Sequence, residues 1–395
     1  MSIISRETTD SHGSHEAVPT QPSSTTAPII RSGSGTVDLD RVTAFAQKVG
    51  ADQGVATNAI LAYLGDRLGI WSALAANTDT DSMALAAQTG LDERYLREWL
   101  AAQAAAGYVE YDRLTKRFSL PAEYAAVLAT DDSPASRAGA FEFTAAVWAS
   151  VEQLARAYQT GEGFAWDKRD HRLFHGVERV FRPAYRTFLV DHWLAAVDGL
   201  TERLQRGIRV LDVGSGLGTA TLLMAGAFPA SRFVGIDTHD LSVAKARETA
   251  RRVGLDDRVR FEVDHAESYS GSYDLVCLLD TLHDLGNPMG ALQHARQALT
   301  PGGTLFLVEP LAGDAVEDNL HPIGLNWYAA SATVCVPASL AQPGRAALGT
   351  QAGPQQTTSL LSAAGFADPR VVMRGRLHLV YAASCPPHAA GVMHR

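Results

Sequence analysis

Three glycines at alternate positions, Gly214, Gly216 and Gly218, mark the stretch of this chain best suited to hold a ligand. They follow the apolar run 208–213 and precede residues whose apolar positions have helical spacing. Glycine lets the backbone turn sharply, sometimes with positive φ, and lets a ligand approach without meeting a Cβ atom. A helix that begins at such a turn adds free N–H groups. Strand, glycine turn and helix together predict a nucleotide-binding element.

Two acids lie where they could serve the same ligand. Asp212 is near the end of the apolar run, and Asp237 ends a second predicted strand, 232–237. An acid at the end of the second strand can accept hydrogen bonds from ribose hydroxyls. The dinucleotide fingerprint G-x-G-x-x-G has its third glycine where this chain has Thr219, so the spacing disfavours a nicotinamide cofactor and an oxidoreductase.

A histidine follows the fourth predicted strand, 275–279, within the segment D-T-L-H-D-L-G-N-P at 280–288. Ligands of open α/β sheets lie at the carboxyl ends of the strands, so His283 is expected close to the nucleotide. A histidine titrates near neutral pH and can take the proton of an attacking hydroxyl. The fifth predicted strand, 304–308, is followed by Glu309.

The glycine turn, the acid at 237, the histidine segment at 280–288 and the acid at 309 follow one another along the chain. In this order they resemble the motifs of class I S-adenosylmethionine (SAM) methyltransferases. The resemblance implies an α/β domain with a Rossmann-like seven-stranded sheet whose last strand is antiparallel. It implies SAM as cofactor and S-adenosylhomocysteine as product. At the end of the third strand, 259–263, the family spacing puts His265 where an acid is expected, so either His265 or Asp264 could meet the adenine. The implied cofactor-binding residues are Asp212, Gly214, Gly216, Gly218, Asp237, Asp264, His265, Ala266 and Asp280.

The pair His283 and Asp284 resembles the His-Asp of small-molecule O-methyltransferases, in which the histidine is the general base. Glu309 matches the acid that orients this histidine, whereas a second, later acid of the family has no clear counterpart here. Two other interpretations stay open: a structural histidine satisfied by a neighbouring aspartate, or a metal ligand beside Asp284 and a distant histidine such as His321. We expect no metal, because no close ligand spacing supports one.

The chain is expected to divide into a disordered leader at 1–36, a winged-helix-like domain at 37–130, a helical connector at 131–200 and the methyltransferase domain at 201–395. The leader is polar, and helices followed by a hairpin near 108–120 predict the winged helix. The motifs G-I-W-S-A-L and D-E-R-Y-L-R-E-W-L-A resemble the N-terminal domain of small-molecule O-methyltransferases. That resemblance implies a homodimer and a domain that covers the substrate pocket.

The predicted substrate side combines the aromatic connector with the segment N-W-Y-A-A-S-A-T-V-C-V-P-A-S-L at 326–340. This segment resembles a stretch of uncharacterised actinobacterial winged-helix methyltransferases. We expect Trp327, Tyr328 and Ser331 to face the acceptor. Some connector aromatics should line an apolar pocket, and the others should be core.

Composition limits the partners. The net charge of −9 and the lack of a basic run argue against nucleic acid, and the charges near 92–98 almost cancel. The sequence contains no apolar run long enough for a membrane span, and no secretory signal is expected. Cys277, Cys335 and Cys385 have neither zinc-site nor disulfide spacing, which fits buried thiols in a reducing cytoplasm.

The sequence therefore predicts a SAM-dependent methyltransferase acting on a small aromatic or apolar metabolite at oxygen. The alternatives are methylation at carbon or nitrogen, and a SAM-binding winged-helix regulator without catalysis.

Overall fold

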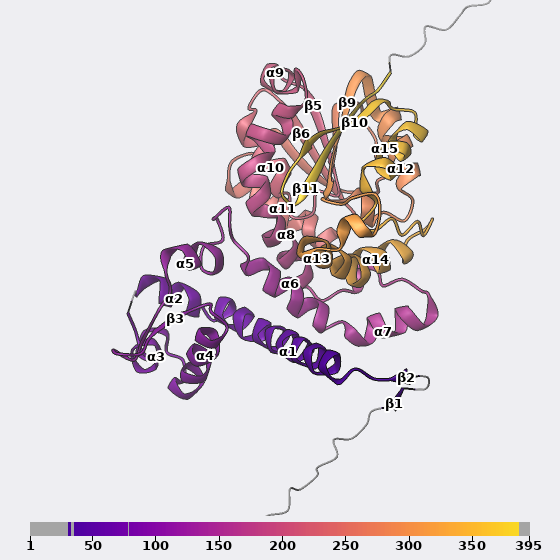
Figure 1. Cartoon of the computed structure of the whole chain (residues 1–395). Helices are drawn as coiled ribbons and strands as arrows, with labels where there is room; N and C mark the ends of the chain where they lie inside the picture. The colour runs from indigo at the N-terminus through magenta and orange to yellow at the C-terminus, as the bar shows by residue number, and fades with distance from the viewer. Residues whose placement is uncertain (1–30, 33–34, 78, 387–395) are drawn as a thin grey trace, which may run out of the picture. The chain divides into compact units, whose positions relative to one another are not determined.

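The computed structural model describes residues 31–32, 35–77 and 79–386 (Figure 1). The predicted leader lies mostly outside these residues, but its end forms two short antiparallel strands, β1 (Arg31–Ser32) and β2 (Gly35–Thr36). The chain divides into two compact units, residues 1–54 and 55–395, and helix α1 (Leu39–Arg67) passes from the first into the second. No helix among the described residues is long and apolar enough to cross a membrane.

The second unit begins with a winged helix, as the sequence predicts. Its elements are α2 (Ile70–Ala76), α3 (Ser82–Thr89), α4 (Glu93–Ala105), β3 (Glu110–Asp112), β4 (Arg117–Ser119) and α5 (Ala122–Leu128). The side chains of Asp81 and Asp92 accept backbone N–H groups at the starts of α3 and α4 and so cap these two helices. Trp71 and Trp99 meet edge to face in the core at 4.6 Å between ring centroids. This core fixes the two helices behind the hairpin.

A helical connector follows, and its helices cross closely. It contains α6 (Ala138–Trp148), α7 (Val151–Thr160), η1 (Trp166–Lys168), α8 (Arg172–Ala184), the π-helix η2 (Tyr185–Trp193) and η3 (Leu194–Ala196). A Cβ on Gly139 would lie 2.4 Å from the Cβ of Arg179, so glycine permits the approach of α6 and α8. Pro183 lies just before the π-helix, where its missing N–H interrupts regular helical bonding. Trp148 is 61% exposed, so this aromatic is not core.

The described residues then form a seven-stranded sheet with the order β10-β11-β9-β8-β5-β6-β7. Strand β11 is antiparallel to both of its neighbours, and the other pairings are parallel, as expected. The strands are β5 (Arg209–Val213), β6 (Arg232–Asp237), β7 (Val259–Val263), β8 (Tyr273–Leu279), β9 (Leu299–Pro310), β10 (Ala367–Arg374) and β11 (His378–Ser384). Strand β9 begins before the predicted 304, because Leu299 pairs with Tyr273 ahead of a register shift.

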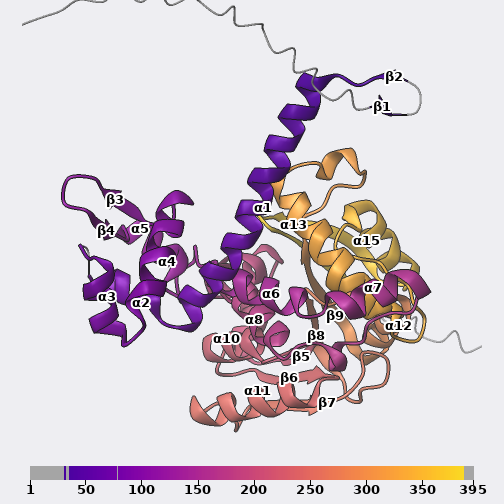
Figure 2. The ribbon, with the colours of Figure 1, turned by 90° about the horizontal axis from the view of Figure 1, so that it is seen from below.

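Helices cover both faces of this sheet (Figures 1 and 2). On one face, α9 (Leu200–Arg206), α10 (Thr219–Ala227) and α11 (Asp240–Arg252) pack on the side chains of Val210, Leu275 and Cys277. On the other, α12 (Pro288–Ala298) and α15 (Gly353–Ala363) pack on Leu211 and Val276. The alternation of side chains along each strand therefore divides the core into two layers.

The segment between β9 and α15 lies outside the sheet. It contains η5 (Glu317–Asn319), α13 (Pro322–Ala330), the π-helix η6 (Ser331–Cys335) and α14 (Val336–Leu340). Hydrogen bonds join it to the connector: the guanidinium of Arg169 donates to the carbonyl oxygens of Thr333 and Val334 at 2.8 and 3.1 Å. The connector and this segment thus close over the sheet edge where the predicted ligand site lies.

Candidate active site

A cavity of about 2220 Å³ opens at the carboxyl ends of β5, β6 and β8. Its walls include the connector, the segment around η6 and the turn before β11. Pockets for one small ligand usually measure about 300–1,000 Å³. This cavity therefore has room for a nucleotide cofactor and a second small molecule side by side.

The glycine turn forms one end of the cavity, and its glycines have different reasons to be glycine. All three have positive φ. A Cβ on Gly218 would lie 2.5 Å from the ring of Phe261, so this residue allows α10 to pack on the sheet. A Cβ on Gly216 would meet no atom of the described residues within 4 Å, and Gly216 lines the cavity. Its backbone is thus open to a ligand, while Gly218 is not among the lining residues.

Asp237 lies beside this open backbone. Its Oδ2 accepts the N–H of Gly216 at 2.9 Å, and its Oδ1 accepts the N–H of His239 at 2.9 Å. Burial raises the pKa of Asp237, although these backbone donors oppose the rise. Each carboxylate oxygen keeps a lone pair that a ribose hydroxyl could use.

Asp212 has a different environment. It is 1% exposed, and its Oδ2 accepts the hydroxyl of Thr221 at 2.5 Å. Burial raises its pKa to about 7. Although Asp212 borders the cavity, its observed contact ties β5 to α10.

The end of β7 brings Asp264, His265 and Ala266 into the cavity wall, so both candidates for the adenine contact stay available. Asp264 accepts the N–H of His265 at 2.8 Å. Nearby, the rings of His239 and Phe174 stack at 3.9 Å between centroids and 5° between planes. This stacked pair joins α8 to the loop after β6, and no motif of the sequence indicates it.

The short helix η4 (Leu282–Asp284) positions His283. Its Nδ1 lies 2.5 Å from Oε2 of Glu309, at the end of β9, and its Nε2 lies 3.5 Å from Oδ1 of Asp284. The other oxygen of Glu309 accepts the N–H of Leu282 at 3.0 Å. The predicted trio of His283, Asp284 and Glu309 is therefore brought together, and His283 and Asp284 line the cavity.

Charge dominates the state of this histidine. Burial lowers the pKa of His283, but the negative charges of Glu309 and Asp284 outweigh burial and raise the pKa well above its usual range. A carboxylate on Nδ1 fixes the tautomer of a neutral imidazole, so that Nε2 is the atom able to accept a proton. The arrangement can hold a proton at Nε2 and stabilise the resulting charge.

Asp280 occupies a strained position just before η4, with φ 51°. Its Oδ2 accepts the hydroxyl of Tyr185 at 2.8 Å, and its Oδ1 lies 3.4 Å from Nε2 of His378. Burial and the charge of Asp280 raise the pKa of Tyr185 well above its usual range, so the phenol stays protonated. A strained residue at a cavity wall is typical of a functional position.

Aromatic rings gather around His378 in the cavity wall. Trp327 stacks on Phe181 at 6.3 Å between centroids, and Trp193 meets His378 edge to face at 5.2 Å. All four border the cavity, but Tyr328 and Ser331 are not among its lining residues. The Oγ of Ser331 instead accepts the N–H of Thr350 at 3.2 Å. Of the three residues predicted on the acceptor side, the structure places Trp327 in the wall.

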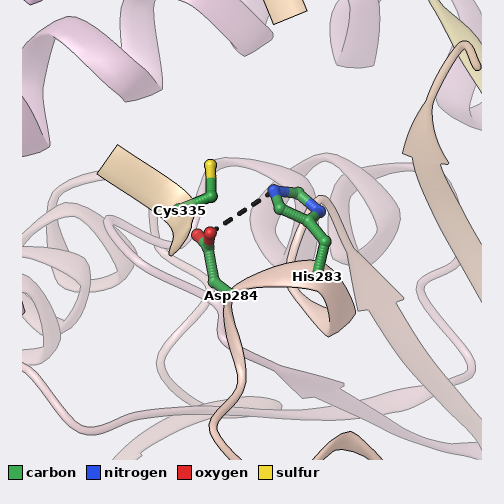
Figure 3. Close-up of side chains that lie close together, drawn as sticks. All are labelled: His283, Asp284 and Cys335. Carbon is green, nitrogen blue, oxygen red and sulfur yellow. Dashed lines mark ion pairs between the residues drawn. The ribbon is translucent and has the colours of Figure 1, made fainter. Parts of the chain in front are cut away.

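Cys335 lies beside His283 and Asp284, a grouping that the spacing of these residues in the sequence does not indicate. Cys335 ends η6, and its sulfur, a ring nitrogen of His283 and an oxygen of Asp284 lie within 4.8 Å of one another (Figure 3). Burial raises the pKa of Cys335 to about 12. His321 does not belong to this group of donors, and its Nδ1 accepts the N–H of Gly324 at the start of α13. The alternative grouping of His283 with His321 is therefore wrong.

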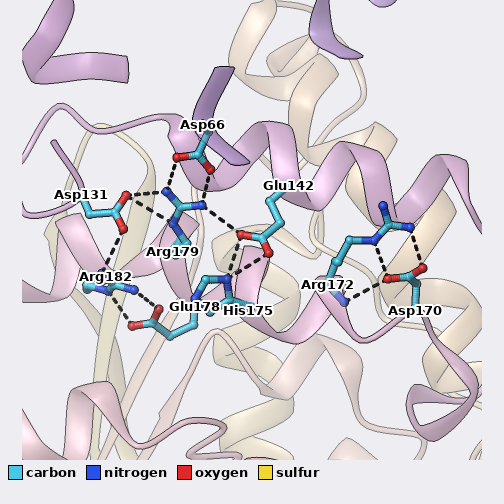
Figure 4. A network of polar contacts seen from close by, with 9 residues as sticks. All are labelled: Asp66, Asp131, Glu142, Asp170, Arg172, His175, Glu178, Arg179 and Arg182. Carbon is cyan, nitrogen blue, oxygen red and sulfur yellow. Dashed lines mark hydrogen bonds and ion pairs between the residues drawn. The ribbon is translucent and has the colours of Figure 1, made fainter. Parts of the chain in front are cut away.

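An ion-pair network links the winged helix to this site (Figure 4). The guanidinium of Arg179 on α8 contacts Asp66 of α1 at 2.6 Å, Asp131 at 2.6 Å and Glu142 at 3.0 Å. The preceding residue, Glu178, accepts the hydroxyl of Thr219, the first residue of α10 after the glycine turn, at 2.7 Å. The residues of this network form no local motif, so their spacing in the sequence does not indicate it.

Comparisons with known proteins agree with this geometry. Residues 56–130 match a family described as Rv2258c-like winged HTH domain, and residues 185–342 match one described as methyltransferase domain. The chain is 33% identical over 121 residues to 27-O-demethylrifamycin SV methyltransferase of Amycolatopsis mediterranei. It is 33% identical over 101 residues to the ubiquinone biosynthesis O-methyltransferase of Xanthomonas campestris. These alignments cover 28% and 26% of this chain, and 44% and 42% of the relatives, so the chain spans less than half the length of either.

Solved structures resemble the chain over most of its length. The mitomycin 7-O-methyltransferase MmcR has a TM-score of 0.64 at 21% identity, with 88% of this chain and 100% of that chain covered. Human N-acetylserotonin methyltransferase in complex with SAM has a TM-score of 0.64 at 18% identity, with 90% and 100% covered. These likenesses extend over both domains and confirm the fold class. The chain thus consists of a winged HTH domain followed by a methyltransferase domain with the class I fold.

Proposed function

We propose that this protein is a SAM-dependent methyltransferase that transfers a methyl group to the oxygen of a small aromatic or apolar acceptor. One observation carries the proposal. The imidazole of His283 borders the same cavity as the open backbone of Gly216, and Glu309 holds the ring from behind. A cofactor at the glycine turn and an acceptor at the histidine would then share one enclosed space.

The chain's own residues fit SAM. The open space beside the backbone of Gly216 suits the amino acid end, the carboxylate of Asp237 suits the ribose, and Asp264 with His265 suits the adenine. Asp280 borders the same cavity just before η4 and would face the sulfonium end. When bound, SAM supplies an electrophilic methyl group, and its transfer to oxygen leaves S-adenosylhomocysteine.

His283 would act as the general base. As the acceptor oxygen attacks, its proton moves to Nε2 of His283, and the charge of Glu309 stabilises the imidazolium that forms. Glu309 also holds the backbone of Leu282, so ring and turn are positioned together. The cavity walls align the reactants and exclude water, which supplies much of the remaining rate enhancement in a direct displacement.

The aromatic wall supports an aromatic or apolar acceptor. Phe181, Trp193 and Trp327 surround His378 and offer flat apolar faces in the same cavity as His283. A phenol, whose ordinary pKa is about 10, would gain most from a base of this kind. Methylation at carbon or nitrogen would need His283 less, so the effect of removing this side chain discriminates between these reactions.

We infer that the winged helix does not read DNA. On α4 the guanidinium groups of Arg94 and Arg97 pair with the carboxylates of Glu98 and Glu93 at 2.6 Å, which neutralises the helix face a DNA reader would present.

We further propose a homodimer in the cytoplasm. Phe45, Val55 and Ile60 of α1 are each more than half exposed, and a second copy would cover such apolar side chains.

Titration calorimetry with SAM, S-adenosylhomocysteine and NADH tests the cofactor assignment. The proposal predicts micromolar binding of the first two and none of NADH, followed by methyl transfer from SAM in a screen of phenols, acids and amines. A folded protein that binds neither SAM nor its product would contradict it. Binding without transfer to any acceptor would favour the regulator.

A further inference from the structure

We propose that His283, Asp284 and Cys335 bind one Zn²⁺ ion in the wall of the active-site cavity. The three residues offer a nitrogen, an oxygen and a sulfur atom, all within 4.8 Å of one another. They come from two segments, η4 and the end of η6, that the fold brings together (Figure 3). The site goes beyond methyl transfer, which needs no metal in the mechanism above.

The spacing of the donor atoms suits a tetrahedral ion. With Zn–N and Zn–O distances of about 2.0–2.2 Å, two tetrahedral ligand atoms lie about 3.4 Å apart. Nε2 of His283 and Oδ1 of Asp284 are 3.5 Å apart. The sulfur of Cys335 lies within 4.8 Å of both atoms. It would have to approach by at most about 1.2 Å, because a Zn–S bond of about 2.3 Å puts sulfur about 3.6 Å from the other two ligand atoms.

Outer contacts already hold the ligands as a zinc site requires. Zinc-bound histidines usually donate their second ring N–H to a carboxylate, and here Nδ1 of His283 lies 2.5 Å from Glu309. The segment that ends in Cys335 is held by Arg169, which is 7% exposed and donates to the carbonyl oxygens of Thr333 and Val334. Both ligand-bearing segments are therefore fixed by groups outside the donor set.

One donor lacks another role among the described residues. Oδ1 of Asp284 is buried, and the partners of this carboxylate near the cluster are the other two members, the imidazole of His283 at 3.5 Å and the thiol of Cys335. A buried carboxylate is costly unless it is fully paired, and a thiol is a weak donor, so a cation is a better partner for this atom. A cation bound between Asp284, His283 and Cys335 would satisfy it.

The donor set identifies the class of metal. Mg²⁺ and Ca²⁺ prefer oxygen ligands alone, whereas a mixture of thiolate, imidazole and carboxylate suits Zn²⁺. Three protein ligands leave the fourth position open, and all three residues border the cavity, so water or an acceptor atom would complete the shell. Binding converts the Cys335 thiol to a thiolate and releases its proton to solvent.

The site has a consequence for the reaction, and this part of the inference rests on the proposed function. Zinc would occupy the Nε2 lone pair of His283, which is the atom that would take the acceptor's proton. The metal-bound and base-competent states then exclude each other. We therefore expect Zn²⁺ to inhibit methyl transfer reversibly, with full activity restored by a chelator.

Co²⁺ bound to the tag-free full chain tests the site without cofactor or acceptor. A cysteine ligand gives a sulfur-to-cobalt charge-transfer band, which exposed histidines cannot give. The inference predicts this band at one equivalent of Co²⁺, its displacement by Zn²⁺, and its loss in Cys335→Ser. Cys385→Ser, which alters a buried thiol outside the cluster, is the matched control and should keep the band.

Two further variants keep the test decisive if Cys335→Ser does not fold. Asp284→Asn should weaken Zn²⁺ binding in a chelator competition, and Glu309→Gln should weaken it by about 10–100-fold through the outer contact. Absence of the band in the folded wild-type chain, or its survival in Cys335→Ser, would overturn the site. Activation by Zn²⁺ would instead overturn the inhibitory role and the base assignment, while leaving the spectroscopic result intact.

Discussion

Glu309 holds His283 from behind, with Oε2 2.5 Å from Nδ1, although the two residues lie on different elements. The other carboxylate oxygen accepts the N–H of Leu282 at 3.0 Å. One side chain thus fixes both the ring and the backbone turn that carries it. Nε2 is left as the reactive nitrogen, on the side of the cavity.

Glu309→Gln should lower kcat by about 10²-fold while the affinity for SAM stays the same. The amide keeps the shape of the side chain but loses the charge that stabilises the imidazolium. Steady-state kinetics and calorimetry on the same preparation separate the two effects. Glu317→Gln, a substitution in η5, is the control and should behave as wild type. Equal losses of kcat and SAM binding would point to a general structural defect instead.

Asp237→Ala should weaken SAM binding by about 10–150-fold, the range for hydrogen bonds to a charged group. The variant removes the carboxylate beside Gly216 that we assign to the ribose. Calorimetry with SAM measures the change, and Asp257→Ala, at an exposed acid beyond α11, is the comparison. Unchanged affinity would refute the ribose assignment.

Gly218→Ala should destabilise the protein more than Gly254→Ala. Both glycines have positive φ, 81° and 69°, so both variants carry backbone strain of about 1–2 kcal/mol. Only at Gly218 would the new Cβ lie 2.5 Å from the Phe261 ring, which adds about 1–3 kcal/mol. Urea unfolding gives both free energies. If the two losses were the same, the contact between the glycine turn and Phe261 would not limit the residue at 218.

His175 should make the stability of the chain depend on pH. Its ring lies 2.9 Å from Glu142, and this hydrogen bond raises the pKa of His175; the charge of Glu178 supports the rise, and burial and Arg179 oppose it. Because the folded pKa is the higher one, the stabilisation is complete below the unfolded value of about 6.5 and is lost as pH rises through the folded value.

His175→Gln should therefore lower the free energy of unfolding more at pH 5.5 than at pH 8.5. Urea unfolding at the two pH values checks this, with His171→Gln, whose side chain is 93% exposed, as control. A loss that is equal at both pH values would contradict the assigned ion pair.

Local pattern predicted the sheet well where each strand is a short apolar run. The bounds of β6 and β7 are those expected, since both runs end at polar residues or turns. Strand β9 is longer than expected because pairing between Tyr273 and Leu299 extends it through a Pro-Gly-Gly turn sequence. Register with a neighbour is a tertiary property, and sequence spacing does not contain it.

The candidate site likewise contains residues that the sequence could place and residues that it could not. The glycine turn, Asp237 and the His283 trio lie at strand ends, so the order of strands was enough to predict that they meet. Cys335 is 52 positions after His283 in the chain and reaches it only because η6 folds over the sheet edge. The network around Arg179 depends likewise on how α1, α6 and α8 pack.

The most direct test of the proposed mechanism is the turnover of His283→Ala, freed of metal by a chelator, with an acceptor identified in the screen. The proposed role of His283 predicts that kcat falls by about 10²–10⁴-fold while the affinity for SAM stays within a factor of about two. Near-normal turnover in a variant that binds SAM would show that His283 is structural and that the acceptor needs no base.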